Sequence, residues 1–148
     1  MNTEIKNKII NHLIKNGKKN KSEKILLKSI KELQKISAKP TNKLIQLALV
    51  FTTPIFKINT IKKKGKKKKL KSQAIPTFIS NKKLKTSFAI KFITSTAKLQ
   101  KSNIFAKKLQ EEILTTSQNK GATIKAKNQI QKQALTNRHL FQYYRWHN

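Results

Sequence analysis

The sequence has no cysteine and no aspartate, and its only acidic residues are five glutamates. Without thiols, the chain can form neither disulfide bonds nor thiolate metal sites. Its three histidines, His12, His139 and His147, are scattered without the spacing of metal ligands, so no metal is expected. The chain also lacks a glycine-rich phosphate loop and a nucleophile beside a placed base. We therefore predict a protein that is not an enzyme, with no cofactor and no small-molecule substrate.

Long hydrophobic runs are absent as well. The uninterrupted apolar runs are only a few residues long, whereas a membrane-spanning helix needs about 20, and residues 1–6 contain no hydrophobic secretory core. A cationic membrane-active protein would concentrate its charge on one amphipathic helix, but here the charge is spread over loops and several faces. These observations predict a soluble or peripheral protein without a membrane partner.

Negative charge is scarce, and positive charge is abundant. Lysine and arginine total 35 against 5 acids, which gives a formal net charge of +30 on 148 residues. Self-repulsion on this scale destabilises a compact state that stands alone. Hydrophobic residues still make up 36% of the chain, enough for a small domain with a thin core. We expect one domain over residues 1–148 whose folding is completed on a partner.

Arginine is nearly absent, since Arg138 and Arg145 are the only two. The other basic residues are lysines, and the chain is also crowded with isoleucine and asparagine. These three residue types have codons rich in A and T, so the composition indicates an AT-rich genome. A nuclear gene for an organellar protein would begin with an arginine- and serine-rich leader. None is visible, so we expect synthesis inside an organelle, first the mitochondrion; a plastid or an AT-rich bacterium is the alternative.

The densest charge lies between residues 62 and 69, where seven lysines surround Gly65. Apolar and polar residues alternate on both sides of this run with the period of a β-strand, as Phe56 and Ile58 show before it. The pattern predicts a two-stranded hairpin over residues 55–79 with a basic tip. Because like charges at a turn repel each other, the arrangement favours a site where phosphates neutralise them. A merely solvated loop is the alternative, although such loops usually mix both signs.

Helical periodicity predicts three helices before the hairpin. The first ends at Asn16-Gly17, the second opens at Ser22, and the third lies between Pro40 and Pro54. Their expected inward-facing residues are Ile5, Ile9, Ile10 and Leu13, then Leu26, Leu27, Ile30 and Leu33, then Leu44, Leu47, Ala48 and Phe51. The residues expected to face outward on the second helix are Lys24, Lys28, Lys31 and Lys35.

Three more helices are predicted after the hairpin. Asn81 caps the fourth, which runs to about Leu99; Ser102 starts the fifth; and the sixth follows Gly121 and runs into Tyr144. Their expected inward-facing residues are Leu84, Phe88, Phe92 and Ile93, then Phe105, Leu109 and Ile113, then Ile130, Ala134 and Phe141. The fold class is thus mainly α, with about six helices in one compact domain and a two-stranded β-hairpin protruding between the third and fourth helices.

Glu111 and Glu112 are the only adjacent acids and raise the question of a catalytic pair. Neighbours on a helix point in different directions, and no histidine or second acid cluster is available to complete such a site. We expect these glutamates instead to balance Lys107 and Lys108 or to meet a basic partner.

Five segments, in this order and spacing, resemble the bacterial and organellar small-subunit ribosomal protein seven family. They are Lys15–Lys19 with Ser22–Ile25, Ala48–Phe56, Ala74–Pro76, Lys82–Leu84, and Asn119–Lys125 followed by a helix to Tyr144-Arg145-Trp146. Each match is short, but together they span nearly the whole chain. Their order and spacing carry the resemblance.

The chain also departs from the family pattern. The basic arm that precedes helix one in bacterial members is not expected, because Ile5 already belongs to that helix. Lysines replace the usual arginines and the second tip glycine of the ribbon. One extra residue lies between Ala134 and Trp146, and the sequence stops at Asn148, before any longer family tail. Contacts made by the arm and the tail are therefore not carried over.

The resemblance implies a structural constituent of the small ribosomal subunit, a primary ribosomal-RNA binder that organises the head (3′ major) domain beside neighbouring small-subunit proteins. It also implies that the hairpin lies near messenger RNA and exit-site transfer RNA. Lysines bind phosphates as point charges, which independently favours RNA. The expected RNA contacts are Lys15, Lys18, Lys19, Lys62, Lys63, Lys64, Lys66, Lys67, Lys68, Lys69, Lys71, Lys82, Lys83, Lys85, Lys120, Lys125, Lys127 and Arg145.

The C-terminal aromatic residues have two interpretations. Tyr143 and Trp146 are candidates for stacking on unpaired bases, or they close the small core, which is the preferred interpretation for Tyr144. One alternative function also stays open. A histone-like DNA-binding protein of an organelle or bacterium would likewise be small and lysine-rich, but it would usually carry an intercalating proline at the ribbon tip, where this chain has Gly65.

Overall fold

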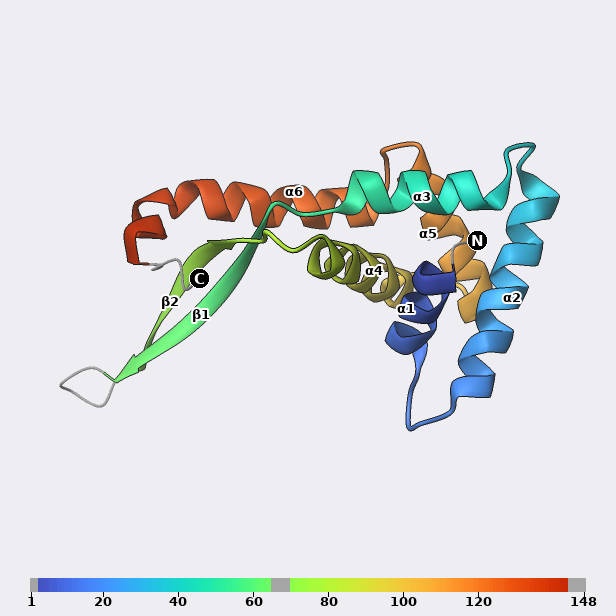
Figure 1. Cartoon of the computed structure of the whole chain (residues 1–148), viewed down its shortest axis with the longest axis horizontal. Coiled ribbons are helices and arrows are strands. Elements are labelled where there is room, and N and C mark those ends of the chain that lie inside the picture. The colour runs from blue at the N-terminus through green and yellow to red at the C-terminus, as the bar shows by residue number, and fades with distance from the viewer. Residues whose placement is uncertain (1–2, 65–69, 144–148) are drawn as a thin grey trace.

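The computed structural model describes residues 3–64 and 70–143 (Figure 1). Its elements, in chain order, are α1 (Thr3–Leu13), α2 (Lys19–Ile36), α3 (Thr41–Thr52), β1 (Phe56–Lys64), β2 (Leu70–Phe78), α4 (Lys82–Leu99), α5 (Phe105–Ser117), α6 (Ala122–Thr136) and the 3₁₀ helix η1 (Arg138–Tyr143). Within the described residues, the predicted class is confirmed: six α-helices and one antiparallel hairpin between α3 and α4.

Helix α5 lies at the centre of the helical body and packs against α2, α3 and α4. Leu109 and Ile113 of α5 meet buried aliphatic residues from all three of these helices, including Leu33, Ile45 and Ile90. Each such side chain contributes roughly 1.5–3 kcal/mol when it is fully buried. The core therefore consists mostly of small and medium-sized aliphatic side chains.

Two predicted helix starts and one predicted end are wrong. Helix α2 begins at Lys19, and Ser22 lies buried in its first turn instead of capping it. Helix α5 begins at Phe105, because Ile104 is extended and no helix can pass through it. Helix α6 ends at Thr136; the chain then tightens into η1, which buries Leu140. The cap that Asn81 was predicted to provide is confirmed, since its side chain accepts a hydrogen bond from the Lys83 N–H.

Several predicted inward-facing residues are exposed. On α3 the buried stripe consists of Leu44, Ile45, Ala48, Leu49 and Thr52, while Leu47 is exposed and Phe51 is half-buried. Helix α3 is apolar on more than one face, and its contacts with both α4 and α5 decide which face is buried. On α2, Leu27 is 49% exposed, because the buried face runs through Ser22 and Ser29. Leu84 is exposed because the buried part of α4 begins at Ala89.

The hairpin leaves the body at the end opposite to α2, and α6 runs between these two parts (Figure 1). Its register pairs Phe56 with Phe78 and Ile58 with Pro76. Proline has no N–H to donate, and it is tolerated here because each strand of a two-stranded sheet is an edge. The ring of Phe56 lies 5.9 Å from that of Phe78 and 5.4 Å from that of Phe141 in η1. This aromatic cluster fixes the base of the hairpin to the C-terminal part of the chain.

Candidate nucleic-acid interface

The hairpin carries part of the predicted lysine set along its distal half. Lys62, Lys63 and Lys64 lie at the end of β1 and Lys71 lies near the start of β2, so that Lys63 stands opposite Lys71 in the register. The predicted contacts Lys66, Lys67, Lys68 and Lys69 fall outside the described residues. Like charges at opposing positions destabilise an isolated hairpin. The backbone thus places a concentrated positive charge away from the helical body.

A second group of predicted lysines surrounds the turn between α1 and α2. Lys15, Lys18 and Lys19 are exposed on both sides of Asn16 and Gly17, whose φ angles are 53° and 71°. The left-handed conformation lets the chain reverse within a few residues. The turn therefore presents three cations on a short, sharply bent segment.

The start of α4 holds the third group. Lys82 and Lys83 are exposed, and the Asn81 side chain accepts a hydrogen bond from the Lys83 N–H at 2.8 Å. Lys85 is half-buried, and its Nζ lies 5.4 Å from the centre of the Phe78 ring. Such a cation–π contact contributes about 0.5–1 kcal/mol at an exposed site. Lys85 therefore ties α4 to the hairpin base in addition to any phosphate contact.

The fourth group lies around the start of α6. Lys120 and Lys125 are exposed, whereas Lys127 is half-buried and donates a 2.6 Å hydrogen bond from Nζ to the carbonyl oxygen of Phe51. This oxygen lies at the C-terminal end of α3, where a cation is favoured by the helix dipole. The sequence gives no signal for this contact, because the two residues are 76 positions apart. An ammonium group has three donors, so Lys127 retains two for a phosphate.

Glu112 holds the α6 end of the body together, and the prediction that it balances Lys107 and Lys108 is wrong. Its side chain is 2% exposed. Oε1 accepts hydrogen bonds from the Thr123 N–H at 3.0 Å and the Thr123 hydroxyl at 2.5 Å, and Oε2 accepts one from Gln100 Nε2 at 2.7 Å. The Thr123 hydroxyl also lies 2.6 Å from that of Thr96 on α4. Glu112 is thus a structural residue, and its neighbour Glu111 is exposed.

Gly121 is required by the close packing next to Glu112. Its φ is 101°, and a Cβ placed on it would lie 2.9 Å from the Thr115 hydroxyl oxygen. Both the conformation and the contact exclude a larger residue without rearrangement. This packing sets the direction in which α6 leaves the body. It thereby also sets the positions of Lys125 and Lys127, which are on this helix.

His12 on α1 is half-buried where this helix meets α4. Its Nε2 is 2.8 Å from the Ser87 hydroxyl oxygen. Burial, and secondarily the positive charge of Lys91, lower the pKa of His12 below its ordinary value. The imidazole is therefore favoured in its neutral form within the folded body.

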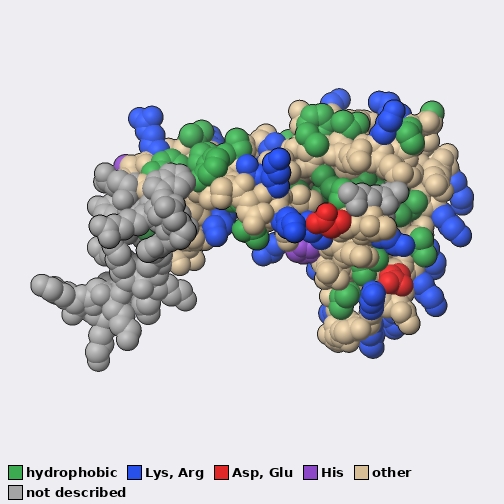
Figure 2. All heavy atoms as spheres, viewed as in Figure 1, with side chains coloured by type: hydrophobic (Ala, Val, Ile, Leu, Met, Phe, Trp, Pro, Cys, Tyr) green, Lys and Arg blue, Asp and Glu red, His purple; other side chains and the backbone are tan. Residues whose placement is uncertain are grey.

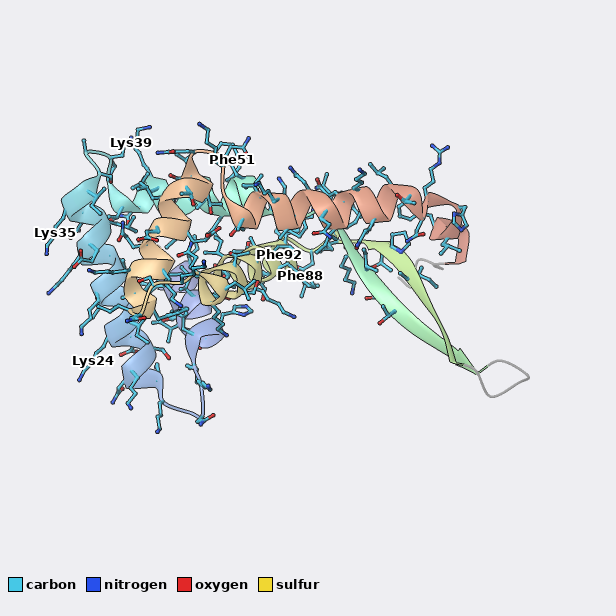
Figure 3. The ribbon with its side chains drawn as sticks, turned by 180° about the vertical axis from the view of Figure 1, so that it is seen from behind. Lys24, Lys35, Lys39, Phe51, Phe88 and Phe92 are labelled. Carbon is cyan, nitrogen blue, oxygen red and sulfur yellow. The ribbon has the colours of Figure 1, made fainter. Side chains whose placement is uncertain are left out.

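Helix α2 carries exposed lysines that the predicted contact set does not include. Lys24, Lys28, Lys31 and Lys35 are exposed, as the pattern predicts. Lys24 and Lys35 project from the outer edge of α2, and Lys39 projects from the turn that follows (Figure 3). Basic side chains are spread over the body, whereas the acidic ones form small isolated patches on the face shown in Figure 2. Net charge alone therefore does not select a binding face.

The remaining predicted contacts lie at the C-terminus. Tyr143 ends η1, whereas Tyr144, Arg145 and Trp146 fall outside the described residues. Among residues 3–64 and 70–143, no group of histidine, aspartate or glutamate side chains could hold a metal ion. In the same residues, no helix is long and apolar enough to cross a membrane.

A small helical body with a protruding basic hairpin and lysine clusters at its turns defines a polyanion-binding protein. Comparison with known proteins makes this class specific. The sequence model of the family "Ribosomal protein S7p/S5e" matches residues 1–138, and the chain belongs to this family. It is a structural constituent of the small ribosomal subunit and not an enzyme, and the DNA-binding alternative is not favoured.

Individual relatives agree with the family assignment. The chain is 29% identical over 145 residues to small ribosomal subunit protein uS7 of Wigglesworthia glossinidia brevipalpis, an alignment that covers 98% of this chain and 88% of the relative. It is 27% identical over 144 residues to uS7c of Bigelowiella natans, with 96% and 87% covered. It is 30% identical over 131 residues to uS7c of Euglena longa, with 88% and 71% covered. The resemblance noted from the sequence is thereby confirmed.

Proposed function

We propose that this chain is a primary ribosomal-RNA binder that organises the head domain of the small subunit, and that residues 1–148 form one RNA-binding domain with the basic hairpin 55–79 inserted in it. The contacts are the lysines predicted from the sequence, at the α1–α2 turn, along the hairpin, at the start of α4 and around the start of α6, together with Arg145. Neighbouring small-subunit proteins complete its surroundings.

One observation carries this proposal: four of the five acids either pair with a lysine or are buried. Glu4 pairs with Lys8 at 3.1 Å, Glu23 with Lys19 at 3.9 Å and Glu32 with Lys35 at 3.8 Å, and Glu112 is buried. In the described part of the chain, Lys15, Lys18, Lys82, Lys120 and Lys125 are exposed and take part in none of these ion pairs, whereas the exposed Lys83 lies near enough to Glu4 for their charges to interact. A phosphate backbone supplies the missing negative charge.

Selectivity for the ribosomal RNA comes from shape. Lysine contacts give strong, salt-sensitive and largely sequence-neutral affinity, so a folded RNA is recognised by matching the body and the hairpin together. The ring contacts of Phe56 with Phe78 and Phe141 support this mode, because they join the base of the hairpin to η1, the 3₁₀ helix that follows α6.

The distal hairpin serves a different purpose in this proposal, holding messenger RNA and exit-site transfer RNA. The described ends of its strands, at Lys64 and Leu70, lie away from the helical body, so changing the lysines there leaves the core contacts in place. Replacing Lys63, Lys64, Lys66 and Lys67 by Gln should leave occupancy of the small subunit unchanged while weakening retention of transfer RNA. A tip variant that no longer assembles would contradict this division of roles.

We also propose that the protein works in an organellar ribosome, with the mitochondrion as its site. The composition supports this, since 33 of the 35 basic residues are lysines and only Arg138 and Arg145 are arginines, as an AT-rich genome produces. The relatives named above are bacterial or plastid proteins. Mass spectrometry of small subunits purified from separated mitochondria and plastids tests the assignment, and detection in plastids alone would refute it.

The RNA contacts are tested with two variants that remove the same charge. One replaces Lys18, Lys19, Lys82 and Lys83 by Gln; the control replaces Lys24, Lys28, Lys31 and Lys35 on α2. Both sets are exposed, and each contains one lysine that pairs with a glutamate.

The measurement is the dependence of affinity for a head-domain RNA fragment on salt. Each lost phosphate contact lowers the log–log slope by about 0.7–0.9. We expect a reduction of roughly two to four in the first variant and less than one in the control. Equal reductions would show that net charge, and not the predicted site, determines binding.

A further inference from the structure

A groove of about 430 Å³ lies between the hairpin, α4 and α6. Its walls are the base of β1, a row of α4 residues that includes Phe88 and Phe92, and α6 residues that include Gln133. The volume falls within the roughly 300–1,000 Å³ of small-ligand sites. Phe88 lies in the half of α4 nearer to the hairpin, and Phe92 lies just past the middle of the helix (Figure 3).

The two α4 phenylalanines are placed to receive a flat ring. They are four residues apart on a helix and therefore lie on the same face, and both are half-buried. In the part of the chain that the structure describes, ring contacts join Phe56 to Phe78 and Phe141, and neither Phe88 nor Phe92 takes part in one. Phe88 is also a wall of a second hollow of about 170 Å³ at the base of the hairpin. Its ring thus stands between two open spaces.

The charges around the groove complement a nucleotide. Lys57 and Lys91 are part of its lining, and no carboxylate is found among its described lining residues. The other large groove, of about 570 Å³ between α1, α3 and α4, differs in both respects: it contains Glu4 and no aromatic residue. A phosphate is therefore favoured beside the aromatic groove. The side-chain amide of Gln133 adds a group that can both donate and accept hydrogen bonds.

We propose that this groove binds one unpaired base of the ribosomal RNA. The base stacks on Phe88 and Phe92, its phosphate lies near Lys57 and Lys91, and Gln133 bonds to its edge. Folded RNAs commonly present unstacked bases in loops and bulges, and proteins commonly receive them on aromatic side chains. This inference rests on the proposed binding of ribosomal RNA and adds to it a contact that depends on the base and not only on charge.

The test uses the double substitution Phe88→Leu and Phe92→Leu, which keeps apolar side chains in the groove but removes the aromatic faces. The control is Phe51→Leu, a half-buried phenylalanine on α3 that does not line the groove. Circular dichroism melts first confirm that both variants are folded. Affinity for the head-domain RNA fragment and base-specific chemical probing of that fragment are then measured.

We expect the double variant to bind about 5- to 150-fold more weakly, the factor that corresponds to roughly 1–3 kcal/mol of stacking per base. One unpaired base that the wild type protects should become reactive. The salt slope should stay unchanged, because no phosphate contact is lost. As a second variant that leaves the aromatic residues intact, Lys57→Gln with Lys91→Gln should instead lower the slope.

Three outcomes separate this inference from the proposal on which it rests. The double variant could keep wild-type affinity and protection while the variant of Lys18, Lys19, Lys82 and Lys83 binds weakly. This outcome would refute the base site and leave the proposed function standing. An equal loss in Phe51→Leu would also refute it, since the groove would then have no special role. A wild-type protein that does not bind the fragment at all would refute the proposed function itself.

Discussion

The buried carboxylate of Glu112 on α5 accepts hydrogen bonds from both the N–H and the hydroxyl of Thr123, the second residue of α6. A third hydrogen bond comes from Gln100, immediately after α4. One side chain thus joins three helices, and it also meets the partial positive charge at the N-terminus of α6. Although the protein has a net charge of +30, this carboxylate does not offset positive charge on the surface. It stabilises the fold from a buried position.

Replacing Glu112 by Ala should lower the free energy of unfolding by about 2–4 kcal/mol, because buried donors on Thr123 and Gln100 would lose their acceptor. The matched control is Glu111→Ala, which changes the same charge at an exposed neighbouring position. It should change stability by less than about 0.5 kcal/mol. Urea unfolding followed by circular dichroism compares the two, and similar losses in both would argue against the buried network.

Gly121→Ala should be destabilising by about 2 kcal/mol or more, because its φ of 101° is unfavourable for alanine and the new Cβ would lie 2.9 Å from the Thr115 hydroxyl oxygen. Gly17→Ala is the control, since its φ is also positive at 71° but nothing lies within 4 Å of a Cβ there. It should cost about 1 kcal/mol. Thermal melts show which variant loses more stability. A larger loss in Gly17→Ala than in Gly121→Ala would contradict the close packing of Gly121 against Thr115.

Stability should decrease as the pH falls below about 6.5, the ordinary pKa of the His12 side chain. Burial and Lys91 lower its pKa in the folded state, so between the folded and unfolded pKa values the unfolded chain binds more protons. This contribution is fully present above the unfolded pKa and is lost as the pH falls through the window. The lowered pKa of Glu4 acts separately, in a window below its ordinary 4.5.

Urea unfolding at pH 7.5 and 5.5 measures the effect of His12. The variant His12→Gln keeps a partner for Ser87 but does not titrate, so its stability should change less between the two pH values. His139→Gln, at an exposed position, should retain the wild-type dependence. An unchanged pH dependence in His12→Gln would assign the effect to other groups.

Substitutions at Lys127 and Lys125 should have different effects on the stability of the fold and on RNA affinity. Lys127→Met removes the hydrogen bond to the Phe51 carbonyl and should cost about 1–2 kcal/mol of stability. Lys125→Met removes an exposed charge and should leave stability nearly unchanged while weakening RNA binding. Unfolding and RNA titration of both variants distinguish the two roles. A Lys127 variant with wild-type stability would show that the α3–α6 contact is unimportant.

Local patterns in the sequence predict most of the architecture. The helical spacing of apolar residues, the Asn16-Gly17 turn and the alternation around Gly65 identify the helices and the hairpin, because each depends on residues close in the chain. The buried position of Glu112 could also have been inferred. Leu109, Glu112, Ile113 and Thr116 have the spacing of one helical face, and all four are buried.

Other features depend on tertiary contacts that local patterns do not encode. Helix α3 is apolar on several faces, so its packing against α4 and α5 selects Ile45 and Leu49 over Leu47. The Lys127 contact with Phe51 joins residues 76 positions apart. The groove lined by Phe88 and Phe92 exists only because the hairpin, α4 and α6 meet there. Long-range packing thus decides which of the predicted cations are structural.

Membership of the small ribosomal subunit is measured most directly by the distribution of the native protein in a sucrose gradient of gently lysed cells or organelles, with quantitative mass spectrometry of each fraction. We expect one copy per small ribosomal subunit, retained at moderate salt together with the ribosomal RNA. Nuclease treatment of DNA should not release it. A protein found mainly with DNA or membranes, or present in only a small fraction of the small subunits, would show that it is not a structural constituent of this subunit.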